Sequence, residues 1–79
     1  MKLRYERGAL ADLKEIFEYL AADDIQAAAR LVAAIEEVGK LIAVHPYIGA
    51  ATRKTSFRQF PIGRYLIVYE IGRDEIVIY

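Results

Sequence analysis

The second half of the chain carries the residues best suited to bind a negatively charged partner. These are the basic residues Arg53, Lys54, Arg58 and Arg64, and the aromatic residues Tyr47, Phe57, Phe60 and Tyr65 are interspersed with them. No aspartate or glutamate occurs between Lys40 and Glu70, although the whole chain has 11 basic and 11 acidic residues and no net charge. Basic residues with aromatics bind RNA by phosphate pairing and base stacking, and they equally bind acidic proteins. Alternatively, the aromatics form the core and the charges are solvated.

Other residue types that carry chemistry form no recognisable site. The single histidine, His45, precedes Pro46 at a predicted helix end, where its side chain can bond to the last carbonyl groups. No cysteine or second histidine accompanies it to bind a metal ion. Ser56 shows no spacing that would join it to His45 and an orienting carboxylate, and the glycines form no phosphate-binding motif. We therefore predict no catalytic residue, no metal and no cofactor.

Length and composition indicate one small cytoplasmic domain. With 79 residues, the chain has the length of a single domain, which we expect to span residues 1–79. The absence of cysteine is typical of a reducing compartment. The first six residues alternate charge with bulk, unlike a signal peptide, and no apolar run approaches the length of a membrane span. These features favour a location in the cytoplasm, with no membrane partner.

Helical periodicity dominates the first half of the chain, after a short alternating strand at Leu3–Tyr5. Apolar residues recur at helical spacing from about residue 9 to residue 22, and again from Ile25 to Ile42. Between these stretches, Asp23 with Gln26 three residues later resembles a capping box. Because so few residues separate the two helices, we predict an antiparallel helical hairpin.

After Pro46 the sequence changes to the periodicity of strands. We predict strands at Ser56–Pro61, Arg64–Ile71 and about residues 74–79, with the first bend at Pro61–Gly63. The order is thus strand, helix, helix and a meander of strands. Segregated helices and strands predict a two-layer α+β fold, in which the N-terminal strand and the helical hairpin accompany an antiparallel sheet. The residues predicted to fill its core are Leu13, Phe17, Ile35 and Ile67.

The strand Arg64–Ile71 is unusual because it is apolar on both faces. Its odd-numbered residues line one face, which can pack on the helices, while Leu66 and Val68 line the other. A second apolar face is what marks a partner surface. We therefore expect this face to be covered either by a segment following Tyr79 or by a protein partner, and the candidate partner-facing residues are Phe57, Phe60, Leu66 and Val68.

Motifs along nearly the whole chain resemble one family. They are Asp12-Leu13, Ile16, Tyr19, Ala28-Ala29, Arg30-Leu31 and Ile35 in the helices, Pro46 and Gly49 in the loop, and Arg58, Phe60-Pro61, Gly63 and Tyr65–Tyr69 in the sheet. In this order and spacing the chain resembles the RelE/ParE superfamily of type II toxin–antitoxin (plasmid stabilisation) toxins. Two positions depart from the family pattern: Ala50 replaces a frequent arginine, and Glu6-Arg7 replaces a frequent serine cap with proline.

The resemblance implies a toxin that is neutralised by a cognate antitoxin, with which it would form a hetero-oligomer. RelE-like members cleave messenger RNA on the ribosome, whereas ParE-like members carry no nuclease site and poison DNA gyrase. One RelE-like sheet arginine falls where this chain has Leu66, and RelE-like members take a tyrosine or histidine from a basic segment that here would follow Tyr79.

These differences favour the ParE-like activity, which is binding to gyrase without catalysis. Family analogy alone is a weak warrant for function, so two alternatives stay open. The first is a RelE-like ribosome-dependent interferase, which would be an endoribonuclease acting on ribosome-bound messenger RNA. The second is an inactive relative that binds only an antitoxin.

Overall fold

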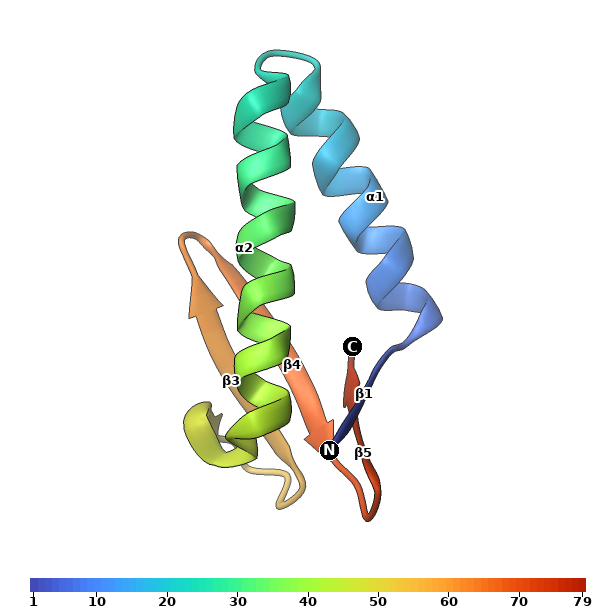
Figure 1. Ribbon diagram of the computed structural model, residues 1–79, viewed down its shortest axis with the longest axis vertical. Coiled ribbons are helices and arrows are strands. Elements are labelled where there is room, and N and C mark those ends of the chain that lie inside the picture. The colour runs from blue at the N-terminus through green and yellow to red at the C-terminus, as the bar shows by residue number, and fades with distance from the viewer.

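The computed structural model describes all residues from Met1 to Tyr79 and arranges them in two layers. In chain order the elements are β1 (Lys2–Tyr5), α1 (Arg7–Ala21), α2 (Ile25–Val44), the 3-10 helix η1 (Pro46–Ile48), β2 (Ala50–Ala51), β3 (Phe57–Ile62), β4 (Tyr65–Ile71) and β5 (Glu75–Ile78). The helices form an antiparallel hairpin in front of the sheet, with α2 passing across β3 and β4 and α1 to one side (Figure 1). The predicted two-layer α+β fold is confirmed.

The sheet has the strand order β1-β5-β4-β3-β2 and is mixed. β3, β4 and β5 form the predicted antiparallel meander, but β1 pairs in parallel with β5, so that Leu3 lies opposite Ile76. β5 is consequently an inner strand, which explains why three successive residues, Ile76, Val77 and Ile78, are all buried. The two-residue strand β2 on the opposite edge was not predicted.

Side chains at the helix ends and the residues of one turn set the limits of the elements. Glu6 caps α1 by accepting a hydrogen bond from Gly8 N–H at 2.7 Å. The cap of α2 is Asp24 and not the predicted Asp23; its Oδ1 accepts from the backbone N–H groups of the second and third helical residues at 3.0 and 3.1 Å. The β3–β4 turn consists of Gly63 and Arg64, one residue beyond the predicted bend. Gly63 has φ +56, as the first position of a type II′ hairpin turn requires.

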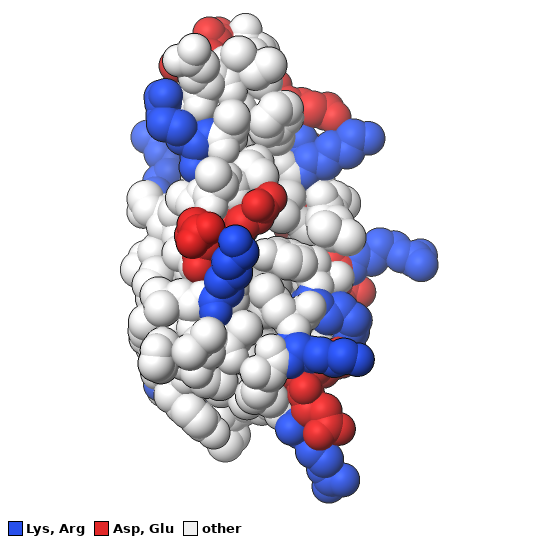
Figure 2. Space-filling view, viewed as in Figure 1, with Lys and Arg blue, Asp and Glu red and all other residues white.

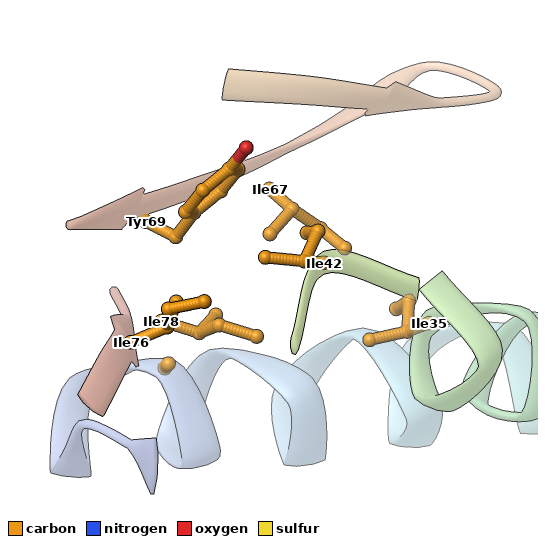
Figure 3. Packing of buried hydrophobic residues seen from close by; sticks show 7 residues of the cluster. Ile35, Ile42, Ile67, Tyr69, Ile76 and Ile78 are labelled. Carbon is orange, nitrogen blue, oxygen red and sulfur yellow. The ribbon is translucent and has the colours of Figure 1, made fainter. Parts of the chain in front are cut away.

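The core lies between α2 and the inner face of the sheet. Ile42, Tyr69 and Ile76 are completely buried, and Figure 3 shows Ile42 beside residues of β4. Of the four predicted core residues, Ile35 and Ile67 are buried, and Leu13 is half-buried against the same cluster. The fourth prediction, that Phe17 is buried between helices and sheet, is wrong.

Phe17 lies in the second half of α1, whereas the residues of α1 that belong to or pack on the core cluster, Ala9 and Leu13, lie in its first half. Phe17 is therefore only half-buried and lies outside the core cluster. Helical periodicity identified the face of α1 that turns toward the rest of the protein. It did not show how much of that face the sheet covers.

Candidate partner-binding site

The four basic residues do not converge on one place. Arg53 and Lys54 are exposed in the connection between β2 and β3, and Arg64 is exposed in the turn at the other end of β3. Because β3 has six residues, these ends lie about 20 Å apart at the usual rise of a strand. Arg58 is half-buried on β3 between them. The sequence identified the basic character of the region but did not show this dispersal.

Arg58 is held in place by the loop beside it. Its Nε donates a hydrogen bond to the carbonyl oxygen of Gly49 at 2.8 Å. Its guanidinium carbon lies 5.2 Å from the centre of the Tyr47 ring, which is the arrangement of a cation–π contact. The predicted phosphate or partner contact is therefore also a structural contact, and its orientation is fixed before any partner arrives.

The buried hydroxyl of Tyr69 forms hydrogen bonds to the loop that contains Pro46 and Gly49. It donates to the carbonyl oxygen of Pro46 at 2.6 Å and accepts from the N–H of Gly49 at 2.9 Å. A Cβ atom at Gly49 would lie only 2.6 Å from this hydroxyl and 2.8 Å from the carbonyl oxygen of Gln59. We call these contacts among Pro46, Gly49 and Tyr69 the loop clamp. Sequence analysis assigned Tyr69 to the core face but missed its hydrogen bonds to the loop.

The predicted partner-facing apolar residues separate onto two faces. Leu66 is 58% exposed on the outer face of β4, where Val68 and, on β3, Phe57 are half-buried. Phe60 lies opposite the buried Ile67 and packs against the core cluster from the helix side. The structure thus places Phe60 in packing, because side chains alternate between faces along a strand. An exposed apolar position remains at Leu66.

Polar contacts cover the other end of the outer face. Glu70 accepts hydrogen bonds from the hydroxyl of Tyr79 at 3.0 Å and from that of Ser56 at 3.3 Å. The hydrogen bond to Glu70 raises the pKa of Tyr79. The rings of Tyr79 and Phe57 are 5.6 Å apart, and Lys54 Nζ lies 5.4 Å from the centre of the Phe57 ring. The acidic and phenolic groups here already have partners.

A cavity of about 120 Å³ lies between α1 and the sheet. It is almost entirely apolar, and residues of α1 such as Leu13 and Ile16 line it together with Tyr65, Leu66 and Ile67 of β4. Tyr79 N–H donates to the carbonyl oxygen of Val68 at 2.8 Å, which continues the pairing of β4 with β5.

His45 and the acidic residues form no further site. His45 ends α2 through its backbone N–H, which donates to the carbonyl of Leu41 at 2.8 Å. The side-chain bond to terminal carbonyls that we predicted for it is not present. No group of three histidine, aspartate or glutamate side chains gathers in a geometry that could hold a metal ion. Neither helix combines the length and apolar character that crossing a membrane requires.

An ion pair on the outer surface should give the stability a weak acid dependence. Arg4 Nη2 lies 3.0 Å from Glu75 Oε1, and the hydrogen bond from Arg4 lowers the pKa of Glu75 below its ordinary 4.5. A lowered pKa stabilises the fold above the ordinary pKa, and this contribution is lost as pH falls through the lowered value. Melting temperatures recorded on acidification should therefore fall less steeply for Glu75→Gln than for the unmodified protein.

The difference in melting temperature between Glu75→Gln and the unmodified protein should be small, because the side chains of Arg4 and Glu75 are both exposed to solvent. The matched control is Glu37→Gln, which removes the more exposed pair with Lys40 on α2. Identical acid profiles of the Glu75→Gln variant and the unmodified protein would contradict the assigned role of the Arg4–Glu75 pair.

The fold of this chain is similar to that of a known protein structure. The structure is similar to one titled "Chromosomal ParDE TA system from P. aeruginosa", with a TM-score of 0.79 and 24% identity, covering 99% of this chain and 89% of that one. Residues 3–79 match the family described as "ParE toxin of type II toxin-antitoxin system, parDE". A Sinorhizobium fredii protein named "Putative toxin Y4kP" is 37% identical over 75 residues, which cover 92% of this chain and 78% of that protein. The chain belongs to the ParE toxin family of type II toxin–antitoxin systems.

Proposed function

We propose that this chain is a cytoplasmic plasmid-stabilisation toxin that binds DNA gyrase and is neutralised by a cognate antitoxin. The observation that carries the proposal is the dispersal of the basic side chains. Arg53 and Lys54 lie at one end of β3, Arg64 lies at the other, and Arg58 is tied to Gly49. Such an arrangement supports contacts with a protein surface more than it supports a centre for RNA cleavage. Residues 1–79 act as one toxin domain in this proposal.

A protein that cleaves an RNA strand internally needs a base, an acid and cations that stabilise the charge developing on the phosphate. Leu66 occupies the position that the RelE-like pattern gives to an arginine, and its side chain brings neither charge nor proton. Two side chains on the outer face could act as an acid or a base, Glu70 and Tyr79. They are hydrogen-bonded to one another. Binding without catalysis therefore accounts better for the residues present.

The antitoxin would cover the exposed apolar surface of β4. Leu66 and Val68 present this surface on the outer face of the sheet, and Phe57 extends it on β3. The apolar cavity beside Leu66 offers side-chain contacts to an extended peptide segment. An antitoxin with such a segment, together with the toxin, would form the hetero-oligomer that we propose.

The test compares two assays on the full gene product, each with and without the antitoxin encoded beside it. We expect inhibition of gyrase supercoiling, no translation-dependent cleavage of messenger RNA, and relief of inhibition by the antitoxin. Charge reversal at Arg53 and Lys54 removes the exposed phosphate contacts and should leave gyrase inhibition largely intact. As a control, the exposed Arg64 is reversed at the opposite end of β3.

Each alternative function has its own outcome in these assays. Ribosome-dependent cleavage of messenger RNA without an effect on supercoiling would establish the interferase and overturn the gyrase proposal. Antitoxin binding without either activity would identify an inactive relative.

A further inference from the structure

An apolar surface covers the end of α2 and the η1 turn, where the only charged group bound to the backbone is the N-terminal ammonium, which donates to the carbonyl of Ala43. Its residues are Leu41, 40% exposed, Val44, 70% exposed, Tyr47, 72% exposed, and Ile48, 42% exposed. We call this set the α2-end platform. Figure 2 shows the lower left of the molecule, over the last turns of α2 and η1, almost free of charged side chains. Contiguous exposure of several large apolar residues is typical of an interaction surface.

The loop clamp holds the platform in one conformation. Tyr69 bonds both Pro46 and Gly49, the residues that flank Tyr47 and Ile48. Since Tyr69 is completely buried and its hydroxyl is used in both directions, the loop cannot move without leaving buried polar groups unpaired. The clamp thus holds the backbone on both sides of Tyr47 and Ile48.

Arg58 provides an oriented charge at the border of the platform. Only its Nε has a partner in the protein, the carbonyl oxygen of Gly49, and its guanidinium rests against the ring of Tyr47. The two terminal nitrogens remain available as a fork that matches a carboxylate. A fixed tyrosine beside a fixed arginine loses little side-chain entropy on binding. These are also the residue types that most often dominate binding energy at protein interfaces.

The charges around the platform define the chemistry of its partner. No acidic residue occurs between Lys40 and Glu70, and Arg58 is the charged side chain that contacts the platform, through the ring of Tyr47. Electrostatic complementarity therefore calls for a folded protein surface with an apolar centre and carboxylates at its rim. The cavity proposed for the antitoxin is lined by residues of α1 and β4, and Figure 1 shows α1 on the opposite side of α2 from η1.

We propose that the α2-end platform is the surface through which the toxin docks on its protein target, with a target carboxylate paired to Arg58. This inference rests on the proposed function, which identifies the target as DNA gyrase. The platform is an exposed apolar surface whose loop part is held by the loop clamp, whereas the cavity beside β4 is a recess that suits an extended segment. Separate surfaces would allow target binding and antitoxin binding to be disrupted one at a time.

The test measures the affinity of purified gyrase for the full-length toxin and for three single variants. Tyr47→Ala removes the central ring of the platform, and Val44→Glu places a carboxylate in its apolar part. Both residues are at least 70% exposed, so neither change removes a core contact. The matched control is Tyr19→Ala, which truncates a tyrosine that is 76% exposed on α1. We expect the two platform variants to bind gyrase about tenfold more weakly or worse, and the control to bind like the unmodified toxin.

Antitoxin affinity and melting temperature are measured on the same proteins. Unchanged values for the platform variants, together with the loss of gyrase affinity, would support the inference. If the unmodified toxin binds gyrase and both platform variants bind equally well, the platform is not the docking surface although the proposed function stands. A loss confined to antitoxin affinity would reassign the platform to the antitoxin. If the unmodified toxin does not bind gyrase at all, the proposed function fails, and this inference fails with it.

Discussion

Replacing Ile42 with alanine should lower the free energy of unfolding by about 2–5 kcal/mol, as buried aliphatic truncations do. Ile42 is completely buried, and it lies where α2 crosses the sheet, beside Ile67 (Figure 3). A domain of this size typically has only about 3–5 kcal/mol of stability in total. The variant should therefore be largely unfolded at room temperature in the absence of a partner. Urea titration followed by circular dichroism measures the loss.

Phe17→Ala provides the matched comparison because it removes a larger side chain from a less buried position. Phe17 is half-buried and lies outside the core cluster, so its truncation leaves no enclosed cavity. We expect it to cost less than Ile42→Ala, and less than the about 3–5 kcal/mol that truncation of a buried phenylalanine costs. A larger loss for Phe17→Ala than for Ile42→Ala would mean that the hairpin packs differently from the structure described.

Local patterns in the sequence were sufficient to predict both long helices, the strands other than β2, and the class of fold. The helical spacing up to Ile42, the stop at Pro46 and the alternation in β4 each report on residues that are close in sequence. The burial of Ile67 and Tyr69 and the exposure of Leu66 follow directly from that alternation. The cap was placed one residue early because Gln26, three residues after Asp23, gives that aspartate the pattern of a capping box, whereas the backbone becomes helical only after Asp24.

Features that depend on distant residues could not be read in the same way. The parallel pairing of β1 with β5 joins the two ends of the chain, and nothing in either segment alone specifies it. The assignment of Phe60 to a partner surface failed because its face depends on its register with β4. Likewise, the contact between Arg58 and Tyr47 is made only after β3 has paired and η1 has turned. The sequence predicted a basic and aromatic region, but not which of its members are held in place.

Replacing Gly49 with alanine should also cause a large loss in the free energy of unfolding, because the added methyl group would meet the loop clamp. The new Cβ would lie 2.6 Å from the Tyr69 hydroxyl and 2.8 Å from the carbonyl oxygen of Gln59, and real Cβ atoms essentially never approach so closely. Gly49 has φ −75, so its backbone conformation would suit alanine and the conflict is purely steric. Overpacking of this kind costs about 1–3 kcal/mol. A displaced loop would add about 1–3 kcal/mol for the unpaired hydroxyl of Tyr69.

A double-mutant cycle separates the steric conflict from a general loss of stability. Tyr69→Phe removes the hydroxyl that the new methyl group would meet, so Gly49→Ala should cost less in that background than in the unmodified protein. Contacting residues typically couple by about 0.5–3 kcal/mol, which urea titrations of the four proteins resolve. Gly8→Ala is the control, because its Cβ would meet only the flexible end of Glu6, at 3.3 Å, and alanine favours the helix. Equal costs of Gly49→Ala in both backgrounds would show that Tyr69 does not fix this loop, and Tyr47 would then lack the rigid presentation on which target docking depends.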